Sequence, residues 1–188
     1  QLVKDEAKRR FALCARLGSQ YIVATPPLEK MVTDHLPDRY RDLLQIGREE
    51  GIKPTFEYIS FFKSVYRLAD AWGIVQKTDD TDSTIILDAF HNWNSNSTLE
   101  DLRQIPLEKI SHYHIDDAAC GKPPTTQKDP DRVMIGEGQI DLKAEIAVLK
   151  EIGYDKTVSL ELFNAELWEQ DPLEVISTGL TRMKELFA

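Results

Sequence analysis

Short apolar runs alternate with longer amphipathic segments along the whole chain. The runs are rich in β-branched and aromatic residues, and they predict strands at 20–25, 55–59, 84–88, 110–115 and 157–162. The amphipathic segments predict helices at about 36–50, 64–78, 99–102, 142–152 and 173–187. Strands followed by helical segments are typical of βα units and of a parallel sheet. The pattern therefore predicts an α/β fold.

The first residues carry a helical pattern with no start signal before it. Ala7, Phe11 and Cys14 recur at helical spacing, and Gly18 ends the run. A closed (β/α)8 barrel takes about 250 residues, and the sequence contains no linker rich in Gly, Pro or Ser. We therefore expect residues 1–188 to be a single domain, the C-terminal portion of an incomplete TIM barrel whose first three βα units are missing. The strands should be parallel and adjacent in sequence order.

Composition and charge narrow the classes of function. Hydrophobic residues make up 41% of the 188 residues, and the formal net charge is -9. An acidic chain without a basic patch is unsuited to nucleic acid, and no apolar run is long enough to span a bilayer. Cys14 and Cys120 have neither a metal nor a disulfide spacing. With no export signal, they indicate free thiols in the cytoplasm. A homo-oligomer is compatible with the sequence.

The last four predicted strands each carry an ionisable residue near their C-terminal end. These residues are Glu57, Asp88, His114 and Glu161. Any one of them alone is more often a helix cap, an ion-pair partner or a satisfied core residue. Together they would meet at one end of the sheet, where three carboxylates repel one another unless a cation lies between them. The set predicts one divalent metal ion, Mn²⁺, Co²⁺, Mg²⁺ or Zn²⁺.

Four segments carry a resemblance to a known family. They are residues 87–91 (LDAFH), 112–117 (HYHIDD), 131–138 (DRVMIGEG) and 159–163 (SLELF). In these segments the chain resembles the xylose isomerase-like barrel family of sugar isomerases and epimerases. The resemblance implies the same four metal ligands, with Glu57 and Glu161 also transferring protons. It further implies that His91 and Arg132 contact the substrate. The segment 60–66 departs from the pattern.

The resemblance implies an isomerase or epimerase that acts on a sugar or cyclitol, an inosose-like or ketose substrate. A carboxylate base removes the proton next to a carbonyl, a second carboxylate returns it, and the metal stabilises the enediolate. Simpler roles remain open at the two predicted substrate contacts. Arg132 could be a surface residue that pairs with Asp129 or Asp131, and His91 could be a polar residue of the loop after its strand. His112 is expected to pack beside the site.

Three other functions compete with the isomerase. A lyase on the same scaffold, such as inosose or 3-dehydroshikimate dehydratase, starts with the same proton abstraction and then expels a hydroxyl group. An abasic-site endonuclease shares the barrel, but it uses a multi-metal cluster with more histidines, and this chain has 4 histidines and an acidic charge. A non-catalytic binding module is the third alternative. Product mass, DNA binding and metal-dependent turnover distinguish them.

Overall fold

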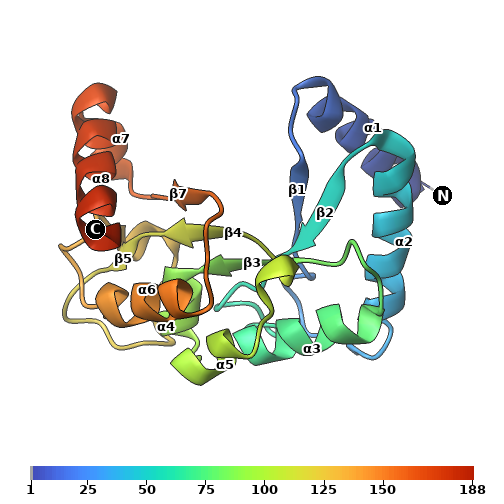
Figure 1. Ribbon diagram of the computed structural model, residues 1–188, viewed down its shortest axis with the longest axis horizontal. Coiled ribbons are helices and arrows are strands. Elements are labelled where there is room, and N and C mark those ends of the chain that lie inside the picture. The colour runs from blue at the N-terminus through green and yellow to red at the C-terminus, as the bar shows by residue number, and fades with distance from the viewer. Residues whose placement is uncertain (1) are drawn as a thin grey trace.

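Five parallel strands form the centre of the protein (Figure 1). The computed structural model describes residues 2–188. Their order in the sheet follows the sequence: β1 (Tyr21–Ala24), β2 (Lys53–Phe56), β3 (Ile85–Asp88), β4 (Ile110–Ile115) and β7 (Val158–Leu160). All four pairings are parallel. The predicted parallel sheet in sequence order is confirmed, and β1 and β7 lie at its two edges.

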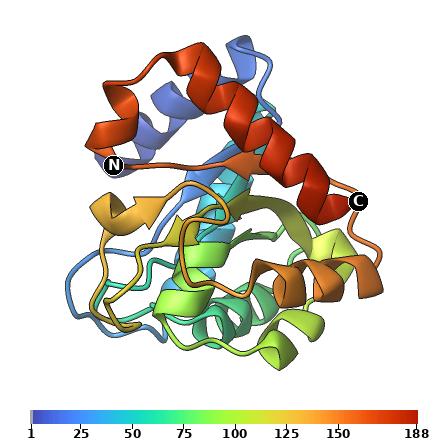
Figure 2. The same cartoon turned by 90° about the vertical axis from the view of Figure 1, so that its left-hand side faces the viewer.

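Helical segments connect the strands and pack along the outside of the sheet (Figures 1 and 2). The longer helices are α1 (Leu2–Arg16), α2 (Leu36–Glu50), α3 (Leu68–Thr78), α6 (Leu142–Glu151) and α8 (Pro172–Phe187). Shorter ones are α4 (Ala89–Asn94), α5 (Leu99–Arg103), α7 (Ala165–Trp168) and the 3-10 turns η1 (Leu107–Lys109) and η2 (Asp129–Asp131). Within residues 2–188, no helix is both long and apolar enough to cross a membrane.

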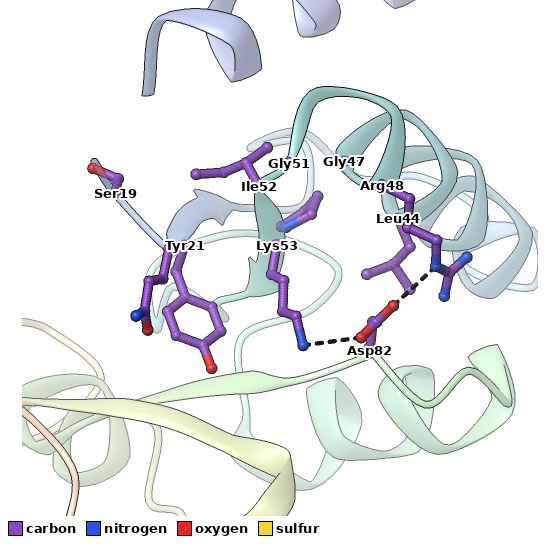
Figure 3. Close-up of a pocket in the computed structure, with 11 residues that line it drawn as sticks. Ser19, Tyr21, Leu44, Gly47, Arg48, Gly51, Ile52, Lys53 and Asp82 are labelled. Carbon is purple, nitrogen blue, oxygen red and sulfur yellow. Dashed lines mark hydrogen bonds and ion pairs between the residues drawn. The ribbon is translucent and has the colours of Figure 1, made fainter. Parts of the chain in front are cut away.

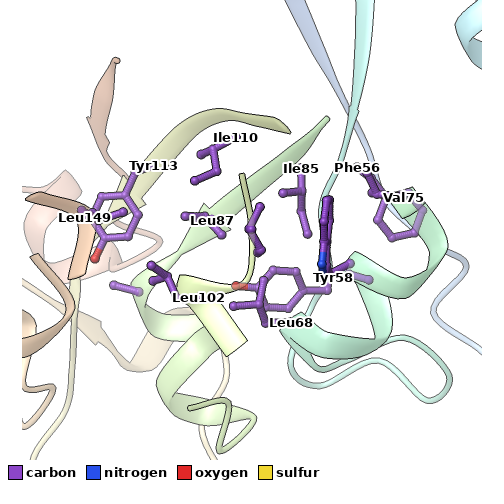
Figure 4. Packing of buried hydrophobic residues seen from close by; sticks show 14 of the residues in the cluster. Phe56, Tyr58, Leu68, Val75, Ile85, Leu87, Leu102, Ile110, Tyr113 and Leu149 are labelled. Atoms are coloured by element: carbon purple, nitrogen blue, oxygen red, sulfur yellow. The ribbon is translucent and has the colours of Figure 1, made fainter. Parts of the chain in front are cut away.

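The apolar core fills the space between the sheet and these outer helices (Figure 4). Leu87 and Tyr113 from the strands are fully buried against helix residues such as Leu68, Leu102 and Leu149. Each fully buried side chain of this size contributes about 1.5 to 3 kcal/mol. The outer face of the sheet is thus the apolar one, which leaves the strand ends as the place for polar side chains.

Two strands end earlier than their apolar runs predict. β2 covers Lys53–Phe56 rather than 55–59, and β7 covers Val158–Leu160 rather than 157–162. Glu57 and Glu161 therefore lie just beyond the ends of their strands instead of inside them. A carboxylate at such an end can turn toward a shared site, whereas one inside a strand is held by the pleat.

The loop role of His91 is wrong, because the residue lies in α4. This six-residue helix has the sequence AFHNWN, and two asparagines make it a weak helix former. The helix is stabilised at its N-terminus by Asp88, whose carboxylate accepts a hydrogen bond from the His91 backbone N at 2.8 Å. His91 is therefore held at a fixed position immediately after β3.

The polar stretch at 116–140 also has more structure than predicted. Two short antiparallel strands, β5 (Asp117–Ala118) and β6 (Arg132–Val133), pair within it. The carboxylate of Asp117 accepts from the backbone N of Gly136, Gly138 and Ile140 at 2.9 to 3.1 Å. A side chain on Gly138 would collide with that carboxylate. The segment is therefore tied down where it passes the ends of β3 and β4.

Candidate metal centre

Four ionisable side chains meet at the C-terminal ends of β2, β3, β4 and β7. Glu57, Asp88, His114 and Glu161 each offer one ligand atom, and these atoms all lie within 4.8 Å of one another. The side chain of Glu161 is 30% exposed, whereas those of the other three are less than 10% exposed. The structure thus brings together all four residues that the strand-end pattern singled out, and one side of the cluster is open to solvent.

The imidazole of His114 lies at the centre of the carboxylates. Its Nδ1 is 3.1 Å from Glu57 Oε1, 3.3 Å from Glu161 Oε2 and 3.7 Å from Asp88 Oδ2. The other ring nitrogen, Nε2, is 3.0 Å from Nε2 of His112. His112 therefore contacts the imidazole from behind, on the side away from the carboxylates, which agrees with the expected packing position.

The surrounding charges shift the pKa values of the cluster in opposite directions. Burial opposes a charged imidazole at His114, but hydrogen bonds to Asp88, Glu161 and Glu57 outweigh it and raise the pKa of His114 to about 12. Burial would also raise the pKa of Asp88, yet the positive charge of Arg132, together with the interactions with His91 and His114, holds it well below its usual range. Burial raises the pKa of Glu57, with the charges of Asp88 and Glu161 adding to the effect.

This charge pattern fits a bound cation. Three carboxylates around one imidazole stabilise positive charge so strongly that the imidazole retains a proton far above its ordinary pKa of about 6.5. The donor set, one nitrogen and three carboxylate oxygens, is of the kind that Mn²⁺, Co²⁺, Mg²⁺ or Zn²⁺ accept. A metal at the same place would bind Nδ1 of His114 and one oxygen of each carboxylate.

Arg132 lies directly beside this cluster, so its interpretation as a surface residue is wrong. Its side chain is 1% exposed and is stacked over the ring of Phe90, with the guanidinium carbon 4.7 Å from the ring centroid. Nη1 donates to Asp88 Oδ2 at 3.0 Å and to Asp116, and Nε donates to Asp129 at 3.3 Å. The guanidinium therefore joins a metal-cluster carboxylate to two further acids.

Asp116 and Asp117 have separate partners although they are adjacent in sequence. Asp116 accepts from the backbone N of Phe90 at 3.0 Å and from the guanidinium of Arg132. Asp117 holds the turn at 136–140 described above. Asp116 thus orients Arg132, whereas Asp117 supports a turn.

His91 is buried against the guanidinium. Its Nε2 is 3.2 Å from Nη2 of Arg132, and its Nδ1 is 3.0 Å from the hydroxyl of Ser60. Burial lowers the pKa of His91 to about 4, and the positive charge of Arg132 adds to the effect against the opposing charge of Asp88. The ring is therefore neutral at physiological pH.

A second buried polar network behind α4 has no counterpart in the expectations from sequence. Tyr58 donates to Oδ1 of Asn92, and Nδ2 of Asn92 donates to the carboxylate of Glu145 on α6. Burial raises the pKa of Glu145 to about 7. One sequence signal could have revealed it, because Glu145 lies in the same apolar stripe as Leu142 and Leu149.

The hollow shown in Figure 3 lies at the opposite end of the strands. It encloses about 410 Å³ beside the N-terminal ends of β1 and β2. Its cations are already paired, since Asp82 accepts from Arg48 Nε at 2.9 Å and lies 3.0 Å from Lys53 Nζ. Both cations of this hollow therefore already have a carboxylate partner.

Comparison with known proteins gives consistent results. The model of a family described as "xylose isomerase-like TIM barrel" matches residues 1–186. An inosose isomerase of Bacillus subtilis (strain 168) is 34% identical over 181 residues, which cover 93% of this chain and 65% of that protein. A 3-dehydroshikimate dehydratase of Pseudomonas putida (strain KT2440) is 25% identical over 164 residues, covering 85% of this chain and 26% of that protein.

A solved structure has the same fold. The crystal structure of the IolI protein with a bound zinc atom superposes with a TM-score of 0.90 at 32% identity, covering 97% of this chain and 68% of that chain. This chain thus spans about two thirds of the length of such proteins, and 65% of the inosose isomerase from Bacillus subtilis.

Proposed function

Because the chain belongs to the xylose isomerase-like TIM barrel family, we propose that it takes part in a divalent-metal-dependent isomerisation of an inosose-like cyclitol or a ketose. The observation that carries this proposal is the convergence of Glu57, Asp88, His114 and Glu161 at one end of the sheet. The inosose isomerase relatives support the choice of substrate class. The inosose isomerase relatives are longer than this chain, which covers 65% of the Bacillus subtilis protein.

The metal and the two glutamates divide the chemistry between them. A divalent ion held by these residues would supply polarisation of the substrate carbonyl and stabilisation of negative charge on its oxygen. Glu57 follows β2 and Glu161 follows β7, and β3 and β4 lie between these two strands. The two glutamates therefore approach the cluster from opposite sides. One carboxylate would remove the proton next to the carbonyl and later release it to solvent, and the other, protonated beforehand from solvent, would deliver a proton to the neighbouring carbon. Asp88 and His114 would hold the ion.

The environments of the two glutamates suit different stages of the reaction. Glu57 is buried, with 8% of its side chain exposed, and its Oε1 lies 3.1 Å from Nδ1 of His114. The side chain of Glu161 is 30% exposed on the open side of the cluster, where substrate would arrive. We assign proton removal to Glu161 and proton return to Glu57. Arg132, with His91 behind it, would hold a substrate oxygen.

A metal-dependent dehydratase is the second candidate, and the similarity to 3-dehydroshikimate dehydratase favours it. The first step would be the same, but the intermediate would then lose a β-hydroxyl as water. Arg132 donates hydrogen bonds only, and protonation of a leaving hydroxyl needs an acid. Glu57, the more buried of the two glutamates, is the group that we assign to supply that proton.

One experiment separates these functions. The chain is incubated in D₂O with Zn²⁺, Mn²⁺, Co²⁺ or Mg²⁺ and a panel of inososes, ketohexoses and 3-dehydroshikimate, and products are followed by NMR and mass spectrometry. An isomerase gives a product of unchanged formula, with deuterium at the carbon that received the proton. A dehydratase gives a product lighter by one water. A chain that binds metal but turns over none of these would refute the proposal for the chain alone.

A further inference from the structure

Two buried residues outside the metal cluster, Ser60 and Asn94, form a chain of hydrogen bonds that reaches the imidazole of His91. Ser60 follows β2 in the segment 60–66 that departs from the family pattern, and Asn94 is the last residue of α4. Asn94 is fully buried and Ser60 is 9% exposed. Neither has a partner in the metal cluster, so their hydrogen bonds require another explanation.

The amide of Asn94 has a fixed orientation. Its Oδ1 accepts from the backbone N of Thr125 at 2.9 Å and of Gln127 at 3.3 Å. Its Nδ2 donates to the carbonyl of Gln127 at 3.1 Å. Because the backbone donors and acceptor determine which end is oxygen, the second hydrogen of Nδ2 must point to the Ser60 hydroxyl, 2.8 Å away. Ser60 Oγ is therefore an acceptor from Asn94.

The next link is the imidazole of His91. A guanidinium has only donors, and Nη2 of Arg132 lies 3.2 Å from Nε2 of His91. Nε2 of His91 must therefore accept with its lone pair. Because a neutral imidazole carries one hydrogen, that hydrogen is on Nδ1. That hydrogen points to Ser60 Oγ at 3.0 Å, which can accept a second bond.

One interaction competes with this arrangement. The backbone N of Ser60 also approaches Nδ1 of His91, at 3.4 Å, and it would favour a lone pair there. The hydroxyl bond is the shorter of the two, and it satisfies Arg132 at the other end of the ring. Edge contacts with Tyr58, Phe61 and Phe90, at 5.7 to 6.3 Å between ring centroids, surround the imidazole. The balance between the two tautomers therefore depends on the hydroxyl of Ser60.

We infer that Ser60 and Asn94 are positioning residues that hold His91 as the Nδ1–H tautomer, so that Nε2 accepts a hydrogen bond and orients the guanidinium of Arg132. His91 acts through Arg132, because its own side chain is buried beneath it. The guanidinium then presents a donor to the substrate, which specifies an oxygen acceptor such as a carbonyl or an enediolate oxygen. The choice of substrate group rests on the proposed function, but the tautomer does not.

The test is ¹⁵N NMR of the histidine ring nitrogens, measured on the protein without added metal or substrate. The chain has 4 histidines, and His91→Gln identifies the signals of His91 by their loss. The wild type should show a protonated Nδ1 and an unprotonated Nε2 at this residue. Ser60→Ala should move the signals toward the Nε2–H tautomer, because only the backbone N of Ser60 then faces Nδ1. Ser60→Thr, which retains the hydroxyl, should preserve the wild-type pattern.

The outcomes separate this inference from the proposed function. A wild-type His91 protonated on Nε2, or a Ser60→Ala spectrum identical to that of the wild type, would overturn it whether or not the protein turns over a substrate. If the protein is active, Ser60→Ala should also lower kcat/KM by about 10- to 100-fold, the usual effect of losing such a supporting hydrogen bond, and Ser60→Thr should restore it. Loss of activity with an unchanged tautomer would assign Ser60 another role.

Discussion

Replacing the buried carboxyl of Glu145 by an amide should make the protein more stable at alkaline pH. Glu145 is 4% exposed on α6, and its carboxylate accepts a hydrogen bond from Asn92. Burial raises its pKa from 4.5 to about 7, with the charge of Asp88 adding to the shift. The protonated carboxyl is therefore favoured in the folded protein, and ionisation of this group works against folding.

The sign and the size follow from this pKa. A carboxyl whose pKa is higher in the folded than in the unfolded state binds its proton more tightly when folded, so its stabilising effect is complete below pH 4.5. That effect is lost as the pH rises from about 4.5 through 7. At about 1.4 kcal/mol per pH unit, the total is about 3 kcal/mol. Glutamine retains an oxygen for Asn92 and removes the charge.

The comparison of Glu145→Gln with the wild type measures this effect directly. Urea unfolding followed by tryptophan fluorescence, from pH 5 to 8.5, should show nearly equal stability at pH 5. At pH 8 the variant should be more stable by about 2 to 3 kcal/mol. The exposed Glu169, changed to Gln, is the matched control and should show no such trend. A difference between wild type and Glu145→Gln that is constant with pH, or a variant less stable at pH 8, would refute the reasoning.

Three further predictions concern the cluster and the turn beside it. Changing Glu161 to Gln should lower turnover by about 10²- to 10⁴-fold, and it should lower zinc affinity by less. Steady-state kinetics and zinc titration measure the two effects. A variant with full activity would place the chemistry elsewhere. Zinc binding at pH 7 should release about one proton from His114, whose pKa is about 12 without metal. Calorimetry in buffers of different ionisation enthalpy should detect this proton. A binding enthalpy that is the same in every buffer would contradict the prediction. Gly138→Ala should destabilise the protein by about 2 kcal/mol or more in urea unfolding, because its Cβ would collide with Asp117. Gly73→Ala, with open space around it, is the control and should be neutral or stabilising.

The sequence was sufficient to predict the sheet and the convergence of four ionisable side chains, because both depend on periodicity. Each apolar run gave a strand, and the residue at each strand end was fixed by chain order alone. The roles of Glu57, Asp88, His114 and Glu161 in binding or catalysis remain predictions. What the pattern could not supply was the helix α4, since its propensity is weak and the cap from Asp88 stabilises it.

The supporting hydrogen bonds were beyond prediction for a different reason. Ser60 and Asn94 are 34 residues apart in the chain, and their contact depends on how the loop at 125–127 folds against α4. The burial of Arg132 depends in the same way on its contacts with Asp88 and Phe90. No local periodicity encodes such contacts, so a sequence can name the polar residues of a site without giving their partners.

The position of β1 at the edge of the sheet affects how its backbone exchanges with water. In a parallel pair, the N–H and C=O of one residue point to the same side, and successive residues alternate. The carbonyls of Gln20 and Ala24 accept from the backbone N of Lys53 and of Glu57. The backbone groups of Tyr21 and Val23 therefore point away from the sheet. Their amide hydrogens should exchange with deuterium orders of magnitude faster than those of β3, which lies between two strands. With two outward residues, the edge offers only a short template for pairing with another strand.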